Sequence, residues 1–369
     1  MQSSPVRRAL SFLGVYRFCI FAENNSKMTI IQQPESFSFS SALKDIILES
    51  AVNVTVSFSA GSTEFLREIY TPDNQNRIYI RDLSRLPLPY ISPVVLRQSF
   101  NIIVTPADGS AGSVINFTVQ YSLTKINVSA EKFLENFFLT TLRNEKITYP
   151  EQNEFLSLVV SAATTIEIIA YRKSGSQSSR TIQISSSNVN KVVTVDVSPA
   201  IFSDPGSISY IVVTAGVRTF TFYLRRSSER LTQFIFINTF GVKETFIPSG
   251  VTLRENNYKN LFGYFSGLYR KYNIELVKLY TANTGVMTEV MADWIESLFL
   301  SEEVFVLSSD GIEQEVTIEE STVKRSTARD ELPAYEFKYR LSKRNHDEFF
   351  VTIAQTSRIF DNTFDLTFN

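Results

Sequence analysis

The sequence predicts an all-β fold, mainly antiparallel, built of tandem β-sandwich domains, the last of which carries one amphipathic helix. The chain has 30 Phe and 16 Tyr, and with Ile, Val and Thr these residues favour the half-buried surfaces of sheets. Short runs that alternate apolar and polar residues recur along the chain, separated by turn residues. One strand–turn–strand pattern also recurs at long intervals, which is typical of sandwich domains in tandem rather than of a solenoid.

The first predicted domain covers residues 28–125. Its runs NVTVSFS and INFTVQYSL place apolar side chains on one face of a strand and polar side chains on the other. That alternation is typical of an antiparallel sheet with one face in water.

The second predicted domain covers residues 126–228. Its run YIVVTAGVRTFTFYL resembles NIIVTPADGSAGSVINFTVQYSL of the first domain, and it turns tightly at Ala215-Gly216. The segment SAEKFLENFF, residues 129–138, predicts a short helical turn that opens this domain. We place the domain boundaries near Lys125 and near Ser227, where the sequence becomes abruptly polar.

The third predicted domain covers residues 229–369 and begins with FIFINTFGVKETF, residues 234–246. We read this stretch as a hairpin that turns at Gly241, with both faces of its first strand largely buried. Asn238 lies at the turn, where its amide either binds a ligand or, if buried, finds a partner within the protein.

An amphipathic helix is predicted near residues 287–300. Its apolar residues recur at helical spacing and form one stripe, with acidic residues opposite. Such a stripe either packs into the core of the domain or binds a partner protein. The stripe consists of Met287, Met291, Trp294, Ile295 and Leu298.

The N-terminal 27 residues allow three readings. VRRALSFLGVYRFCIFAENN has two arginines before an apolar run, as in a signal peptide or membrane anchor, but Arg17 interrupts the run and no small-residue cleavage site follows. The segment is otherwise an ordered arm, or the natural start lies near Met28. No apolar run reaches the roughly 20 residues that span a bilayer.

Composition excludes several kinds of chemistry. The chain has 36 basic and 38 acidic residues, so it lacks the basic surface expected of a nucleic-acid-binding protein. With one cysteine, Cys19, and one histidine, His346, it has no internal disulfide framework and no Cys/His zinc site. His346 lies among charged residues, which favours a surface turn over a catalytic base. We predict no enzyme activity, no metal and no cofactor.

The segment YFSGLYRKY contains the best candidate binding residues, Tyr264, Tyr269 and Tyr272. Tyrosines around two glycines can stack on sugar rings, but they equally pack at sheet edges and protein interfaces. The residues that we single out for a ligand or an interface are these three tyrosines, Trp294 and Asn238.

Five sequence blocks resemble an uncharacterised β-rich family of prophages in gut bacteria of the Bacteroidales type. They are the opening stretch of the third domain, IIQQPESFSFSSALKDIIL, FLENFFLTTLRNEKITYPEQNEFLSLVV, ADWIESLFLSEEVFVL and VTIEESTVKRSTARDELPAYEFKYRLSKRN. The resemblance extends from about Met28 to Arg344, and residues 1–27 depart from it. It implies a structural protein of the phage tail or baseplate and carries no catalytic residues.

We therefore expect a non-enzymatic virion protein that works by self-association, forming a homo-oligomer and contacting other virion proteins. It would be assembled in the host cytoplasm into the virion, with no nucleic-acid partner and no membrane span. The alternative is a bacterial cell-surface adhesin or carbohydrate-binding protein built of tandem sandwiches, for which a glycan would be the ligand.

Overall fold

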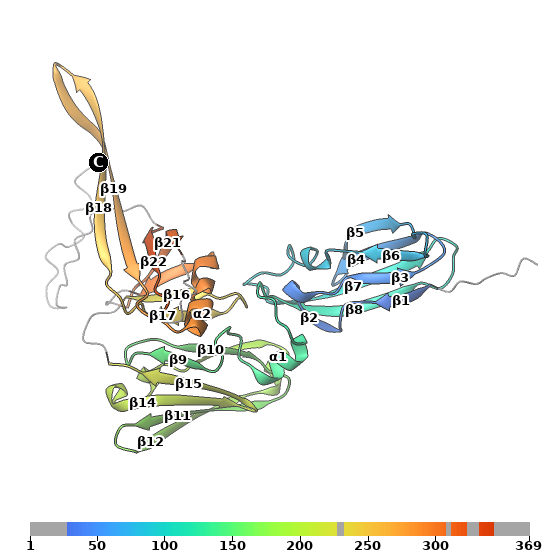
Figure 1. The fold of residues 1–369 in the computed structure, drawn as a ribbon, viewed down its shortest axis with the longest axis horizontal. Helices are drawn as coiled ribbons and strands as arrows, with labels where there is room; N and C mark the ends of the chain where they lie inside the picture. The colour runs from blue at the N-terminus through green and yellow to red at the C-terminus, as the bar shows by residue number, and fades with distance from the viewer. Residues whose placement is uncertain (1–27, 227–231, 308–310, 323–331, 343–369) are drawn as a thin grey trace, which may run out of the picture. The chain divides into compact units, whose positions relative to one another are not determined.

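The computed structural model describes residues 28–226, 232–307, 311–322 and 332–342, and the protein is all-β and mainly antiparallel, with two α-helices in the part described (Figure 1). Residues 1–27, Cys19 among them, and His346 lie outside the described residues. Contacts group the chain into two compact units. One contains the chain up to Gln33, Asp45–Arg81 and Asn101–Asn116, and the other contains the remainder.

The first eight strands form two sheets, as expected for a β-sandwich. The smaller sheet has the order β1-β3-β6, and the larger has the order β2-β8-β7-β4-β5, with β2 parallel to β8. The alternation seen in the sequence is observed in the burial, since Val54, Val56 and Phe58 are all enclosed. The strands are β1 (Thr29–Gln32), β2 (Phe37–Phe39), β3 (Ile46–Glu49), β4 (Val54–Ala60), β5 (Thr63–Tyr70), β6 (Arg77–Ile80), β7 (Arg97–Pro106) and β8 (Ser113–Gln120).

The next seven strands form a second pair of sheets, preceded by the helix α1 (Ala130–Asn136). The five-stranded sheet has the order β12-β11-β14-β15-β9 and the two-stranded sheet the order β10-β13. Gly216 has φ of 63° between β14 and β15, where the sequence predicts the tight hairpin. The strands are β9 (Glu145–Thr148), β10 (Phe155–Val159), β11 (Thr164–Arg172), β12 (Gln177–Ile184), β13 (Val192–Asp196), β14 (Ile208–Ala215) and β15 (Arg218–Leu224).

The C-terminal part is one seven-stranded sheet with the order β17-β16-β20-β21-β22-β19-β18, and the helix α2 (Glu289–Leu300) lies between β19 and β20 in the chain. The hairpin β18–β19 continues well beyond the rest of this sheet (Figure 1). The strands are β16 (Gln233–Ile237), β17 (Lys243–Phe246), β18 (Leu253–Phe265), β19 (Leu268–Asn283), β20 (Val304–Leu307), β21 (Glu313–Thr322) and β22 (Glu336–Leu341).

Helix α2 begins where its sequence supplies a cap and buries its apolar stripe. The Thr288 hydroxyl accepts a hydrogen bond from the Met291 amide at 3.3 Å, which satisfies one of the free N–H groups at the helix start. Trp294, Ile295 and Leu298 are fully buried. The stripe of α2 therefore packs into the core.

One cluster of buried side chains joins strands β10–β15 to the C-terminal sheet and α2. It includes Phe220 and Phe222 of β15, Phe234 of β16, Trp294 of α2 and Phe337 of β22. These two parts of the chain therefore share a continuous core within one unit. The predicted boundaries of the three domains stay a prediction.

The hairpin that opens the C-terminal sheet turns at Gly241, as expected from FIFINTFGVKETF. Gly241 has φ of +77°, and a Cβ there would lie 2.4 Å from Leu96 Cδ2. Only glycine tolerates that backbone conformation in so little space. In the strand before the turn, Phe234, Ile235 and Phe236 are all buried.

Candidate functional site

The hairpin of β18 and β19 projects from the C-terminal sheet as a two-stranded ribbon, which we call the arm (Figure 1). Strand β19 pairs with β22 only from Leu279 to Asn283. Beyond that point, from Asn256↔Lys278 to Phe265↔Leu268, the described strands β18 and β19 pair only with each other. At roughly 3.3 Å per residue, the ten residues of β18 from 256 to 265 extend about 30 Å.

The tip of the arm is a two-residue turn formed by Ser266 and Gly267. Their φ angles are 50° and 77°, and positive φ at both central positions is the feature of a type I′ hairpin turn. This turn follows the right-handed twist of the two strands, so the ribbon is a continuation of β18 and β19 and not a loose loop.

Aromatic and basic side chains share one face at the tip. Tyr264 pairs with Tyr269, and Phe262 pairs with Lys271, so the four side chains point to the same side of the ribbon. The tyrosine rings meet edge to face with centroids 5.1 Å apart, and the Lys271 ammonium lies 6.0 Å from the Phe262 ring centroid. We call these four residues the tip face.

The arm exposes an unusual amount of apolar surface. Tyr264 and Tyr269 are 64% and 78% exposed. Single exposed apolar residues are normal, but a contiguous exposed group marks an interaction surface. The other large side chains of the arm that lie in water are Tyr258, Leu261, Phe262 and Leu268.

Charge is distributed unevenly between the arm and the segment that follows it. Residues 256–274 contain three basic residues, Lys259, Arg270 and Lys271, and no acidic residue. Residues 279–323 contain no basic residue and ten acidic ones. These are Glu289, Asp293, Glu296, Glu302, Glu303, Asp310, Glu313, Glu315, Glu319 and Glu320.

A hollow of about 200 Å³ lies where α2 ends beside the turn after β16; we call it the groove. Its apolar lining includes Val94, Leu123 and Leu300, which are 87%, 51% and 63% exposed. Glu302 and Glu303 also line it and lie in water. The groove thus combines an apolar floor with negative charge.

The structure brings together two of the residues singled out in the sequence. Tyr264 and Tyr269 form the ring pair at the arm tip. Tyr272 lies in β19 where the register moves from Leu261↔Asn273 to Phe262↔Lys271, so its backbone is the extra residue of a bulge. The Tyr272 side chain is outside the part of the chain that the structure describes.

Trp294 and Asn238 are placed in the interior. Trp294 is 0% exposed and Asn238 is 4% exposed. The Asn238 side chain donates to the Leu139 carbonyl at 2.8 Å and accepts from the Phe240 amide at 2.9 Å. Its amide is therefore used to hold the turn after β16, as a buried amide requires.

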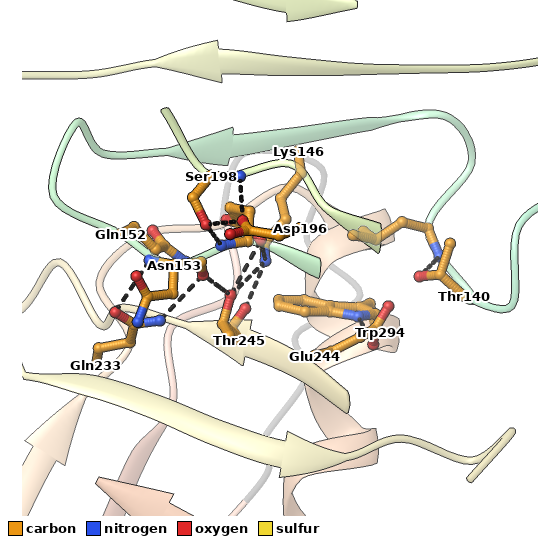
Figure 2. Close-up of polar contacts among 12 residues, drawn as sticks. Thr140, Lys146, Gln152, Asn153, Asp196, Ser198, Gln233, Glu244, Thr245 and Trp294 are labelled. Carbon is orange, nitrogen blue, oxygen red and sulfur yellow. Dashed lines mark hydrogen bonds and ion pairs between the residues drawn. The ribbon is translucent and has the colours of Figure 1, made fainter. Parts of the chain in front are cut away.

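A buried polar network connects β9, the residues just before β10, and β17 (Figure 2). Lys146 of β9 donates to Glu154 Oε2 at 2.7 Å and to the Thr245 carbonyl. The side chains of this ion pair are 5% and 1% exposed. Thr245 of β17 donates to the same Glu154 oxygen at 3.0 Å, so the network joins the two parts of the shared core.

Glu244 is the second enclosed carboxyl group and lies beside Trp294 (Figure 2). The Trp294 indole Nε1 donates to Glu244 Oε2 at 2.6 Å, and the Lys146 ammonium lies 5.0 Å from the Trp294 ring centroid. Burial raises the pKa of Glu244, opposed by hydrogen bonds from Thr140 and Trp294 and by the charge of Lys146. Burial likewise raises the pKa of Glu154, opposed first by the charge of Lys146.

The sequence reading missed these buried charges. Lys146 and Glu154 were not singled out, and Glu244 was placed only on the strand that leaves the turn. The signal for Glu244 was its position two residues before Phe246 and two after Val242, since alternate residues of a strand share a face. Both neighbours are buried, so the alternation predicts an inward carboxyl group.

Two absences hold for the part of the chain that the structure describes. No group of three or more His, Cys, Asp and Glu side chains in that part of the chain is arranged to hold a metal ion. Among the helices of the same residues, none is long and apolar enough to cross a membrane.

Comparison with known proteins yields little for this chain. No family model matches it, and no curated protein matches it. Among solved structures, it is similar to one described as the crystal structure of calcium binding domain CBD12 of CALX1.1. The identity is 7% and the TM-score 0.20, over 54% of this chain and 100% of that chain. A TM-score that low carries no argument, so its calcium site is not transferred here.

Proposed function

We propose that this chain is a non-enzymatic structural protein of a phage virion, of the tail or baseplate type, that acts through self-association and contacts with neighbouring virion proteins. The observation that carries the proposal is the arm, a two-stranded ribbon with aromatic and basic side chains in water. An isolated two-stranded hairpin is marginally stable in water, and packing against further strands or another surface stabilises it. A partner protein on the arm would supply that packing.

The stiff sheet architecture also suits an assembly protein. Short antiparallel strands and a continuous core hold the root of the arm in a defined position, where β19 pairs with β22. An arm on a rigid base presents its tip to a neighbour without loss of much conformational freedom on docking. The resemblance of the sequence blocks to the prophage family supports the virion setting.

The first test is sedimentation velocity of the full chain over a wide concentration range. A structural role predicts concentration-dependent oligomers, seen as rings, tubes or short arrays by negative-stain microscopy. A chain that stays monomeric throughout contradicts self-association.

The second test concerns the virion. The prophage of the strain that carries the gene is induced, the particles are purified on a density gradient, and their proteins are identified by mass spectrometry. The proposal expects this chain in intact particles at a defined copy number. Its absence from particles that contain the other tail proteins contradicts the virion role.

The exposed tyrosine pair also supports a second candidate, a bacterial cell-surface adhesin that binds carbohydrate. Aromatic faces stack on sugar rings, and Tyr264 and Tyr269 are the most exposed of the aromatic side chains that the structure describes in the arm. A glycan array probed with the full chain separates the candidates. Binding that is lost in Tyr264→Ala/Tyr269→Ala, from a chain that remains a monomer, supports the adhesin.

A further inference from the structure

The chemistry of the arm tip suits a partner surface that is both apolar and acidic. Its tip face places Phe262, Tyr264 and Tyr269 beside Lys271, and Arg270 lies on the opposite side of the ribbon, since it pairs with Gly263. Two cations therefore flank an aromatic tip. A surface that covers it must offer apolar contacts in the middle and negative charge at the rim.

The groove has that chemistry. Val94, Leu123 and Leu300 supply exposed apolar contacts, and Glu302 and Glu303 supply two exposed carboxylates at its edge. Its volume of about 200 Å³ is below the roughly 300–1,000 Å³ of small-molecule pockets. A hollow of this size suits a single aromatic side chain inserted from a partner, which is the usual anchor of a protein interface.

One other hollow of the same unit, about 290 Å³ and lined in part by Glu35 and Lys44, has its carboxylate already paired with that lysine at 2.7 Å. A further hollow of the unit lacks a carboxylate in its lining. It measures about 290 Å³ and lies beside the buried network, where Lys146 and Arg225 contribute to its lining. Lys146 is already paired with Glu154, and that lining offers no carboxylate to Arg270 and Lys271. The groove offers two, and opposite charges steer and orient association.

The arm of a given copy does not reach its own groove. In the seven-stranded sheet, β18 and β19 form one edge, whereas β16 lies near the other, with β20, β21 and β22 between β16 and β19. At about 4.8 Å per strand, four steps from β16 to β19 separate them by about 20 Å, and the arm leads away from α2 and β16 (Figure 1). The partner that provides the groove is therefore a different molecule.

We propose that the arm tip of one copy docks into the groove of a second copy, with one ring of the tyrosine pair inserted beside Val94, Leu123 and Leu300 and the basic residues facing Glu302 and Glu303. This inference rests on the self-association proposed above and names the surfaces that perform it. The two surfaces are different, so the contact is heterologous. Repeated head to tail, such a contact closes into a ring or extends as a filament.

The test is a charge exchange in the full chain. Arg270→Glu/Lys271→Glu alters the arm, and Glu302→Lys/Glu303→Lys alters the groove. Each double variant is expected to weaken self-association by about tenfold or more in sedimentation velocity. The quadruple variant, in which both surfaces are reversed, is expected to regain most of the affinity, which a merely unfolded variant does not do.

Matched controls carry the same charge changes elsewhere. Glu313→Lys/Glu315→Lys reverses two exposed acids of the acidic segment outside the groove, and Lys173→Glu/Lys191→Glu reverses two exposed lysines outside the arm. Both controls are expected to associate like the parent chain. A loss of affinity in the controls equal to that in the arm and groove variants overturns the proposal in favour of a general charge effect.

Mixing the arm variant with the groove variant provides a second measurement. In the mixture, the basic arm of the groove variant meets the acidic groove of the arm variant, and the two reversed surfaces also carry opposite charges. The contact therefore predicts that two chains which associate weakly alone assemble when mixed. A mixture that stays monomeric, although the parent chain assembles, overturns the proposed contact.

Two other results separate this inference from the proposed function. If the parent chain assembles and all variants assemble equally well, the inference fails while the structural role stands; if the parent chain is strictly monomeric, both fail.

Co-sedimentation with phosphatidylserine vesicles tests a membrane partner for the basic aromatic tip. Vesicle binding that is lost only in the arm variant, with self-association unchanged, overturns the second copy as the occupant.

Discussion

At the scale of the residue, Glu244 shows how a carboxyl group becomes part of a core. It lies in the short strand Lys-Glu-Thr-Phe, is 7% exposed, and accepts the indole N–H of the only Trp in the chain. A buried carboxylate without a cation in direct contact is costly, so burial raises the pKa of Glu244.

The titration of Glu244 gives a prediction about pH. Its folded pKa is raised above the ordinary value of 4.5, so the folded chain holds the proton more tightly than the unfolded chain. The stabilisation is complete below pH 4.5 and is lost as the pH rises through the folded pKa. Relative to the parent chain, Glu244→Gln should therefore gain stability as the pH rises from about 4.5 to neutral.

Urea unfolding at a series of pH values measures this difference. If the unfolding free energies of Glu244→Gln and of the parent chain depend on pH in the same way, the pKa of Glu244 is not raised. Glu154 is present in both chains, and because Glu154 and Glu244 both interact with Lys146, the comparison measures Glu244 together with its coupling to that ion pair.

The ion pair of Lys146 and Glu154 leads to a second prediction. Lys146→Met leaves the Glu154 carboxylate enclosed and without its cation, which should cost about 3–5 kcal/mol in unfolding free energy. The double variant Lys146→Met/Glu154→Leu contains no buried charge at this site and should be more stable than Lys146→Met alone. A double-mutant cycle in urea measures the coupling.

The surface pair of Lys44 and Glu35 serves as the comparison for that cycle. Its atoms are also 2.7 Å apart, but its side chains are 57% and 43% exposed. Breaking it with Lys44→Met should cost at most about 1 kcal/mol. Equal costs at the two sites would show that burial does not control the energy of the Lys146–Glu154 pair.

At the scale of the element, the arm is a hairpin whose pattern differs from that of the other strands. In β4 and in β8 from Ile115 onward, apolar residues alternate with polar ones because one face of the sheet is buried. In the arm, large apolar side chains lie in water on both strands. The element therefore contributes little to the stability of the monomer, and we propose that its role is association.

That division gives a third prediction. Tyr264→Ser/Tyr269→Ser should change the unfolding free energy by no more than about 0.5 kcal/mol, because both side chains are exposed. The same variant should associate more weakly in sedimentation velocity. Tyr335→Ser is the contrast, since Tyr335 is 1% exposed and its truncation should destabilise the fold by roughly 3–5 kcal/mol. A large loss of stability in the arm variant would mean that the arm packs within its own chain.

At the scale of the whole molecule, the continuous core from β10 to β22 decides how the protein unfolds. Trp294 lies in the same cluster as Ile168 of β11 and Val213 of β14, although these residues are far apart in the sequence. Elements that share one core usually unfold together.

The fourth prediction follows from this shared core. Trp294→Ala should lower the unfolding free energy by about 3–5 kcal/mol and reduce hydrogen-exchange protection of the β11 and β14 amides as much as that of β16 and β20. Trp294→Phe, which retains an aromatic ring but loses the bond to Glu244, should have a smaller effect. If exchange speeds up in β16 and β20 alone, the two parts unfold independently.

Much of the fold could be predicted from local patterns. The hairpins at Gly216 and Gly241 and the apolar stripe of α2 each depend on residues close together in the sequence, so the backbone rules of turns and helices apply. The candidate site was predicted only in part. Tyr264 and Tyr269 were named, but the groove was not, because its lining comes from residues 92–123, 237–239 and 297–303, which only folding brings together.

The sequence by itself determined the all-β class, the amphipathic helix and the hairpin turns at Gly216 and Gly241. It could do so because the alternation of apolar and polar residues and the backbone freedom of glycine set local structure within a few residues. Only the tertiary structure decided that Trp294 and Glu244 lie close to Lys146 and Glu154 in the interior. It also decided that the arm projects beyond the sheet with basic residues at its tip. The physical reason is that burial depends on which faces meet across the chain. The residues next to a charged or aromatic side chain in the sequence therefore do not show whether it lies in a core, a groove or an arm.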